Sequence, residues 1–235
     1  MLGLSHPFSV GENTVPFPLD TGDENKFNTV MAYNYGNITS ETYQPTSFRV
    51  YDVIALQHLY GKNVEKNTGT TPYQYDDNYD FHRVIIDVNG DDTISVVNSE
   101  RDNVIDLRSG KFSSIAPNYV GYYEQCDDGG VIGCGDNPHE HLGRSHNSLL
   151  IDVDTVIENA TGGSGDDILV ANSVANTLKA GDGADIAIFA GKKSDYTIEI
   201  ANDYTVIVTS VTDSTNVDTL TDFEFLKFVT DFSKL

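Results

Sequence analysis

The sequence predicts a mostly β protein, built around a parallel β-roll or β-sandwich with calcium-binding turns. A nine-residue pattern, G-G-x-G-x-D-x-U-x, recurs in register, as GGSGDDILV at 162–170 and AGDGADIAI at 180–188. An alternating apolar pattern at 195–211 is typical of an antiparallel β module. The composition agrees, because abundant Gly (20), Tyr (13) and Phe (11) favour strands and turns over helices.

The elements before the repeats are predicted in chain order. A helix is expected over 47–61, with Ser47 as its N-cap and Gly61 as its C-cap, and the segment ahead of it is irregular and rich in turns. Short strands rich in β-branched residues follow within 82–112. A polar, Gly-rich insertion at 117–148 separates them from the repeats.

The net charge of the chain limits which kinds of molecule it can bind. The 235 residues include 36 acidic and 14 basic side chains, for a formal net charge of -22. Nucleic acids and anionic membranes bind Lys/Arg surfaces, so this charge argues against both. Clustered carboxylates suit hard divalent cations instead, calcium above all. No apolar run approaches the length of a membrane span, and no N-terminal secretory signal peptide is recognised.

The insertion carries both cysteines and three of the histidines. Cys126 and Cys134 flank a Gly-rich connection and could close a small disulfide loop, or they could be two unrelated thiols. A zinc site is less favoured, because such sites usually have more than two thiolate ligands. His139, His141 and His146 lie in HEHLGRSH, which has a glycine where a helical zinc pair needs its second histidine. A solvated His-rich loop is therefore favoured there over a metal site.

Each nonapeptide is a turn followed by a short strand. Gly allows the turn, Asp supplies charge and the large apolar residue faces inward, so Leu169, Leu178 and Ile188 are predicted core residues. Two nonapeptides complete one coil, and stacked coils lie roughly 4.8 Å apart. The two turns are predicted to hold one calcium ion between them, with oxygen ligands from Gly163, Gly165, Asp167, Gly181, Gly183 and Asp185. A flexible Gly/Asp loop is the alternative, and the second match in register disfavours it.

The opposite side of the coil and an earlier acidic turn are weaker candidates. The intervening nonapeptide, ANSVANTLK, has Asn176 where the acid belongs, so a ligand there would have to come from Glu158 and neighbouring carbonyls. In IDVNGDDTI, the spacing of Asp87, Gly90 and Asp92 points oxygens into one loop. An ordinary hairpin turn explains the Asn-Gly of this segment equally well.

Several segments occur in an order that resembles the serralysins. These are secreted bacterial zinc metalloendopeptidases of the metzincin group, with a C-terminal calcium-binding β-roll of RTX type. The segments are GLSHP, TVMAY, DVIALQHLYG, NGDDT and IENATGGSGDDILV, within 1–116 and 149–189. For the acidic turn, the resemblance implies that backbone oxygens of Asn67, Gly69 and Thr71 join Asp87, Gly90 and Asp92 around one calcium ion.

The resemblance also implies roles for residues near the start. In the metzincin pattern H-E-x-x-H-x-x-G-x-x-H, Gly3 aligns with the glycine and His6 with the third zinc-binding histidine. Met31 corresponds to the Met-turn, and Tyr33 to the catalytic tyrosine that ligates zinc and stabilises the oxyanion. The H-E-x-x-H would precede Met1, so the chain is expected to be N-terminally truncated. Zinc binding and proteolysis are expected only in a complete catalytic domain.

The resemblance divides the chain into three parts. Residues 1–62 would be the remnant of the protease domain, 63–190 the β-roll domain with its insertion at 117–148, and 191–235 an antiparallel β module that caps the roll. A secreted monomer is expected, exported through a C-terminal signal, with protein or peptide substrates if complete. A non-catalytic calcium-binding module, used for adhesion, inhibition or assisting secretion, is the alternative. A calcium-dependent carbohydrate-binding or lyase module is a third, and it rests on the tail alone.

Overall fold

The computed structural model describes residues 29–32, 48–62, 65, 67–77, 83–116, 119–121, 142–144, 148–201 and 205–232. These ranges hold one α-helix, α1 (Val50–Tyr60), a 3₁₀ turn, η1 (Lys193–Asp195), and strands in four sheets, so the predicted mostly β fold is confirmed. Neither described helix is long and apolar enough to span a bilayer.

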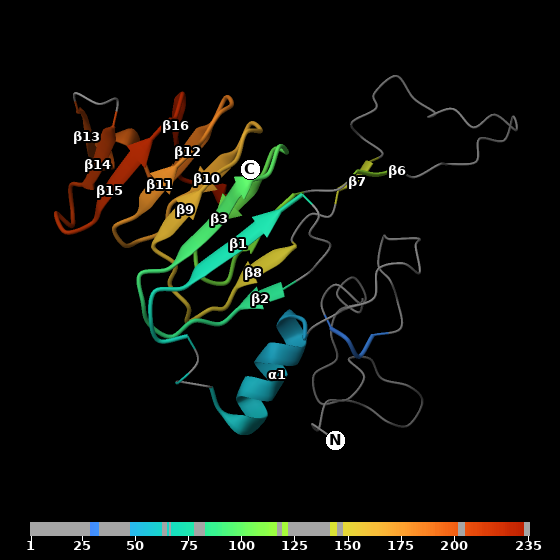
Figure 1. The fold of residues 1–235 in the computed structure, drawn as a ribbon. Coiled ribbons are helices and arrows are strands. Elements are labelled where there is room, and N and C mark those ends of the chain that lie inside the picture. The colour runs from blue at the N-terminus through green and yellow to red at the C-terminus, as the bar shows by residue number, and fades with distance from the viewer. Residues whose placement is uncertain are drawn as a thin grey trace, which may run out of the picture.

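Two sheets form the body of the roll (Figure 1). The seven-stranded sheet has the order β1 (Pro72–Asp76), β3 (Thr93–Asn98), β9 (Asn159–Thr161), β11 (Thr177–Lys179), β15 (Val217–Thr221), β14 (Val206–Ser210) and β13 (Tyr196–Ile200). The four-stranded sheet has the order β16 (Phe225–Val229), β12 (Ile186–Ala190), β10 (Ile168–Val170) and β4 (Val104–Asp106). Smaller sheets join β2 (Arg83–Ile85), β8 (Leu149–Ile151) and β5 (Phe112–Ser113), and β6 (Tyr119–Gly121) with β7 (Leu142–Arg144).

Consecutive strands of the repeat region alternate between the two large sheets. β9 and β11 belong to the seven-stranded sheet, and β10 and β12 belong to the four-stranded sheet. Parallel pairing places Leu169 beside Ala187 and Leu178 beside Ala160, in each case 18 residues away. The predicted coil of two nonapeptides is therefore confirmed.

The core lies between the two large sheets. Leu169 and Leu178 are fully buried in the core cluster and Ile188 is 1% exposed, so the predicted burial of all three is confirmed. In β12, Ile188 alternates with the inward Ala187 and Phe189, so it lies on the other face of that strand. Burying one such side chain stabilises the fold by about 1.5–3 kcal/mol relative to leaving it in water. The inward residues of the repeats therefore hold the two sheets together.

The C-terminal strands close one end of this core. β13, β14 and β15 pair antiparallel, as the alternating pattern predicts, while β15 and β16 extend the two large sheets in parallel with β11 and β12. The rings of Phe189, Tyr196 and Phe228 pack together with centroids 5.4 to 5.7 Å apart. The tail is thus continuous with both sheets of the roll, and the predicted division of the chain at residue 190 stays a prediction.

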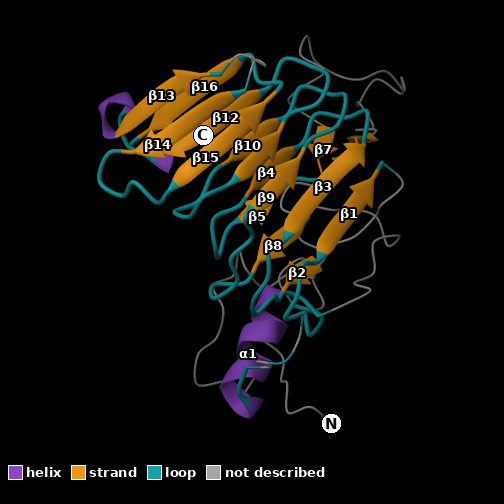
Figure 2. Cartoon of the chain, turned by 60° about the vertical axis from the view of Figure 1, so that its left-hand side comes forward, coloured by secondary structure: helices purple, strands orange, loops and turns teal. Residues whose placement is uncertain are grey.

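Helix α1 lies at the other end of the roll, near β2 and β8 (Figure 2). Its N-cap is Arg49, not Ser47, because the carboxylate of Asp52 turns back to accept the Arg49 N–H at 2.8 Å. The same carboxylate accepts the N–H of Val30 at 2.8 Å and so holds the segment of Met31, the predicted Met-turn, against the helix. Gly61 is confirmed as the C-cap, with φ +82°.

The inward orientation of the repeats can be tested at Leu169. Leu169→Ala is expected to lower the free energy of unfolding by about 2–5 kcal/mol, because it removes buried atoms and leaves a cavity. Urea unfolding at saturating calcium measures this change. Val211→Ala, at a side chain that is 63% exposed, is the control and should change stability by less than about 0.5 kcal/mol. Equal losses in the two variants would contradict the core assignment.

Candidate metal centres

The first candidate centre lies where the loop before β1 meets the loop between β2 and β3. Because β2 and β3 belong to different sheets, the Asn-Gly segment is not a hairpin turn. A Cβ atom placed on Gly90 would lie 2.6 Å from Asp92 Oδ1 and 2.7 Å from the carbonyl oxygen of Gly69. Thr71 N–H donates to Asp92 Oδ1 at 2.8 Å. The glycine therefore lets oxygens from two loops approach each other closely.

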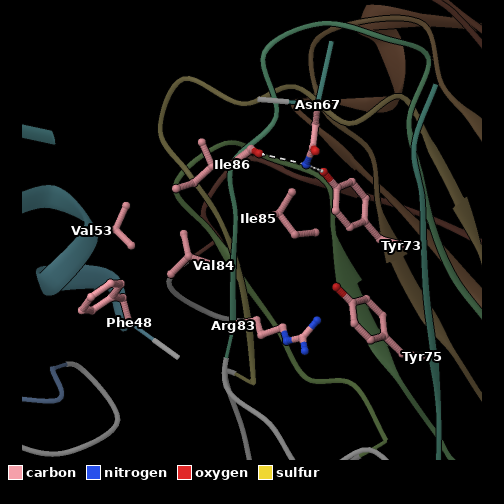
Figure 3. A pocket seen from close by; sticks show the side chains of 9 residues that line it. All are labelled: Phe48, Val53, Asn67, Tyr73, Tyr75, Arg83, Val84, Ile85 and Ile86. Carbon is pink, nitrogen blue, oxygen red and sulfur yellow. Dashed lines mark hydrogen bonds between the residues drawn. The ribbon is translucent and has the colours of Figure 1, made fainter. Parts of the chain in front are cut away.

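Asp87 supplies the second carboxylate of this centre. Tyr73 donates its hydroxyl proton to Asp87 Oδ2 at 2.6 Å, and Asn67 Nδ2 donates to the Tyr73 oxygen at 2.9 Å. Asn67 also points its amide toward the carbonyl of Ile86, at the rim of a pocket of about 320 Å³ that lies between α1 and the strands (Figure 3). Asp87 is thus held on one oxygen and open on the other.

Two oxygens of this centre are buried without a partner in the described part of the chain. They are Asp87 Oδ1 and Asp92 Oδ2, on residues only 4% and 1% exposed. Burial raises the pKa of Asp92, and the neighbouring charge of Asp87 raises it further. Two facing buried carboxylates with free oxygens are costly unless a cation neutralises them, so the donor set fits a calcium ion.

Backbone oxygens complete the first centre only in part. The Gly69 carbonyl stands beside Gly90 and accepts the Thr71 hydroxyl at 2.9 Å. The Asn67 carbonyl accepts the N–H of Val88 at 3.3 Å, and the Thr71 carbonyl accepts the N–H of Thr93 at 3.1 Å. Gly69 is therefore the best placed of the three predicted backbone ligands, and the full ligand set stays a prediction.

The second candidate centre lies between the two glycine-rich turns, 162–167 and 180–185. A Cβ atom on Gly181 would overlap the carbonyl oxygen of Gly163, and one on Gly183 would lie 2.5 Å from that of Gly165. Gly181 and Gly183 also adopt φ of +110° and +137°, which favour glycine. The four predicted glycines thus come together as the 18-residue period requires, with carbonyl oxygens in the gap between the turns.

The two aspartates of this centre are not equivalent. Asp167 accepts Asn103 N–H at 2.7 Å on Oδ1 and Gly163 N–H at 2.7 Å on Oδ2. Asp185 accepts Asp167 N–H at 2.7 Å on Oδ1, whereas its Oδ2 is buried without a partner among the described residues. Burial, with the nearby charges of Asp167 and Glu224, raises the pKa of Asp185 to about 6. A cation between the turns would therefore find one open, buried carboxylate oxygen.

These contacts belong to a ladder along one edge of the roll, which we call the glycine edge. It consists of Asn103, Asp167, Asp185 and Glu224, each directly before a strand of the four-stranded sheet. Asn103, Asp167 and Asp185 each donate their backbone N–H to the carboxylate of the next member, at 2.7 Å in each case. Asn103 and Glu224 were not predicted. The sequence does contain a hint of both residues. NVID and EFLK each begin with a polar or acidic residue followed by apolar ones, as the repeat strands do, but the insertion and the tail separate these segments from the regular repeat.

The opposite edge, which we call the asparagine edge, contains Asp92, Glu158, Asn176 and Asp218. Asp92 N–H donates to Glu158 Oε2 at 2.9 Å, so Glu158 lies beside the first centre. The Asn176 amide donates to the Glu158 carbonyl at 3.0 Å and to Asn172 Oδ1 at 2.9 Å, while its own Oδ1 accepts Asn172 N–H at 3.0 Å. In the turn between Asn172 and Asn176, which lacks the glycines and the acid of the other repeats, hydrogen bonds of neutral amides therefore hold the loop together.

Within the described ranges, no three His, Cys, Asp or Glu side chains gather as a compact metal cluster. Both centres therefore combine one or two carboxylates with backbone carbonyls, which suits calcium better than zinc. The ion pairs Lys62–Asp154, Arg101–Asp77 and Arg108–Asp106 do not include a carboxylate of these centres. His6, Tyr33, Cys126, Cys134, His139, His141 and His146 lie outside the described residues.

Comparison with known proteins places this geometry in context. The family model described as peptidase M10 serralysin C terminal matches residues 136–235. The chain is 28% identical over 201 residues to metalloprotease AprA of Pseudomonas entomophila (strain L48), covering 76% of this chain and 36% of AprA. It is 29% identical over 196 residues to serralysin of Proteus mirabilis, covering 75% of this chain and 34% of that protein. The chain thus spans about a third of the length of these relatives.

Asp218 on the asparagine edge gives a test by pH. The side chain is 1% exposed, and burial raises its pKa to about 7, whereas an unfolded aspartate titrates near 4. The folded protein therefore binds a proton that the unfolded chain has released, and this term increases stability as pH falls from about 7 to 4.

Asp218→Asn keeps an oxygen for the Asn176 N–H, which Asp218 Oδ1 accepts at 2.8 Å, and removes the charge. At saturating calcium the variant is expected to be more stable than the wild type at pH 8, and the two should converge toward pH 4. Thermal unfolding at several pH values measures the difference. A difference that does not change with pH would contradict the buried, titrating state of Asp218.

Proposed function

Because residues 136–235 match the family model of the serralysin C terminal, we propose that this chain is the calcium-binding C-terminal part of a secreted, serralysin-like zinc metalloendopeptidase. The observation that carries the calcium part is the set of buried carboxylate oxygens without a partner, on Asp87, Asp92 and Asp185. All three stand at predicted calcium positions. The relatives are named as metalloproteases and serralysins, and this supports proteolysis as the activity of the complete protein.

Calcium would act on this chain as a folding ligand. The turns bring carboxylates of Asp167 and Asp185 into adjacent coils, where their charges repel one another. A bound ion would replace that repulsion by attraction, so its binding energy would add to the stability of the roll. Extracellular modules bind calcium at roughly 10⁻⁴–10⁻³ M, so folding would follow secretion into a calcium-rich medium.

Zinc and substrate chemistry are proposed for the complete protein. His6 would serve as one zinc ligand, and Tyr33 would ligate zinc and stabilise the oxyanion of a protein or peptide substrate. A zinc centre of this class also needs an H-E-x-x-H motif, whose Glu acts as the base. The excess of acidic side chains argues against nucleic acid as a partner, and we propose a secreted monomer.

Calcium-dependent folding is tested by circular dichroism of this chain in EGTA and during calcium addition. The expected result is a change from coil to strand near millimolar calcium, with no comparable change in magnesium. In the same titration, Asp92→Asn is expected to bind one ion fewer or at least about tenfold more weakly. Asp213→Asn is the matched control, because Asp213 is exposed between β14 and β15, away from this centre. A spectrum that is identical in EGTA and in calcium would contradict the calcium proposal.

Proteolysis is tested separately from calcium binding. This chain alone is expected to show no casein hydrolysis with zinc and calcium present, because H-E-x-x-H is absent from it. Reading the coding sequence immediately upstream is expected to show an in-frame H-E-x-x-H. A stop codon directly upstream would favour the alternative, a non-catalytic calcium-binding module. If this chain bound zinc stoichiometrically and hydrolysed casein, the prediction that proteolysis requires the H-E-x-x-H motif would be wrong.

A further inference from the structure

The outer face of the four-stranded sheet carries a row of buried side chains that the core does not explain. Val170 of β10 lies beside Asp106 of β4 on one side and beside Ile188 of β12 on the other. Neighbours in sequence such as Leu169 and Ala187 point into the core, so the three residues of the row point outward. Asp106, Val170 and Ile188 are nevertheless only 7%, 3% and 1% exposed. Something other than the opposite sheet therefore covers this row.

Arg108 stands at the β4 end of the row. Its Nε and Nη2 atoms donate to Asp106 Oδ1 and Oδ2 at 2.9 and 2.6 Å, so two charge-assisted hydrogen bonds hold the guanidinium on the outer face. Its Cζ atom lies over the ring of Phe232, 3.6 Å from the ring centroid. A cation in this position attracts the face of an aromatic ring. The Asp106–Arg108 pair therefore forms a fixed binding site for Phe232.

Phe232 has to cross the sheet to reach Arg108. The last strand, β16, ends at Val229, and β16 and β4 are the opposite edges of the four-stranded sheet. Three strand spacings separate these edges, which is about 14 Å. Three extended residues span about 10 Å, and the side chains of Arg108 and Phe232 bridge the rest. Residues 230–232, which we call the C-terminal strap, therefore run across the outer face past β12 and β10.

We infer that the C-terminal strap closes over the outer face when the sheet forms, and that Arg108 is the residue that holds it closed. Pairing of β4, β10, β12 and β16 sets the distance between Arg108 and Phe232, so the binding site does not exist in the unfolded chain. The unfolded chain leaves its C-terminal end open to exopeptidases. The folded roll holds Phe232 in place, so it resists trimming from this end. Calcium would close the strap by folding the roll, and this part alone rests on the proposed function.

The test is digestion of this chain with a broad carboxypeptidase in calcium, followed by mass spectrometry of the shortened products. Each rate is divided by the rate for the same variant unfolded in urea, so that the preference of the enzyme for a residue cancels. Trimming of the folded wild type is expected to stop before Phe232 is removed. Arg108→Lys keeps a cation beside Asp106 but loses the planar group over the ring, so removal of Phe232 should become at least about threefold faster. Lys111→Arg, at an exposed side chain in the same loop, is the matched control and should not change the rate.

A second variant separates the strap from a general loss of stability. Phe232→Ala leaves Asp106 and Arg108 paired, and trimming past residue 232 is expected to quicken as it does in Arg108→Lys. The double variant should show no further increase, because both changes remove the same contact. Additive effects would mean that the two residues are not partners and would overturn the strap.

Circular dichroism of the same samples distinguishes the two proposals. In EGTA the wild type is expected to lose its strand signal and its resistance to trimming together. A roll that stays folded in EGTA would overturn the calcium proposal and leave the strap standing. Equal relative rates in the folded wild type and in folded Arg108→Lys would overturn the strap and leave the calcium proposal standing.

Discussion

The structure depends on how negative charge is stacked along the glycine edge. Parallel coils lie roughly 4.8 Å apart, so an acid at a fixed position of each turn must face the acid of the next turn. Asp167, Asp185 and Glu224 meet in this way, and each accepts the backbone N–H of the turn before it. Those N–H groups satisfy one oxygen of each carboxylate but do not neutralise its charge. The coil spacing that builds the core thereby brings together carboxylates whose mutual repulsion a bound cation would relieve.

The two edges of the roll accommodate their polar groups differently. On the glycine edge, glycines lack the Cβ atoms that would fill the gap between turns, so carbonyl oxygens line a space next to the open Oδ2 of Asp185. On the asparagine edge, Asn172 and Asn176 close their turn with amide hydrogen bonds, which need no ion. The first centre lies at the start of the asparagine edge, where Asp92 and Asp87 again leave buried oxygens open. Under the calcium proposal, the stability of the roll would therefore depend on calcium unevenly along its length.

Hydrogen bonds from backbone N–H groups to carboxylates also join the segments at the two ends of the roll. β15 and β16 continue the two sheets, so the C-terminal strands add one more turn to the glycine edge and cover the core with aromatic rings. At the other end, Asp52 ties α1 to the segment of Met31. In each case a carboxylate, Glu224 at one end and Asp52 at the other, accepts a backbone N–H from a segment that is distant in sequence.

The sequence by itself determined the features that depend on local spacing: the 18-residue coil, the inward Leu169 and Leu178, the glycine-rich turns and the C-cap at Gly61. Only the tertiary structure decided which turns stack on one another. Asn103 reaches Asp167 across the insertion, and Glu224 reaches Asp185 across three strands, so neither contact leaves a periodic signal. Likewise, the local sequence of the Asn-Gly segment predicts a hairpin, and only the assignment of β2 and β3 to different sheets makes the segment part of a candidate metal centre. The period of apolar residues in the sequence indicates which side of a strand faces the core. Which distant strands pair with each other is decided by the packing of the whole roll.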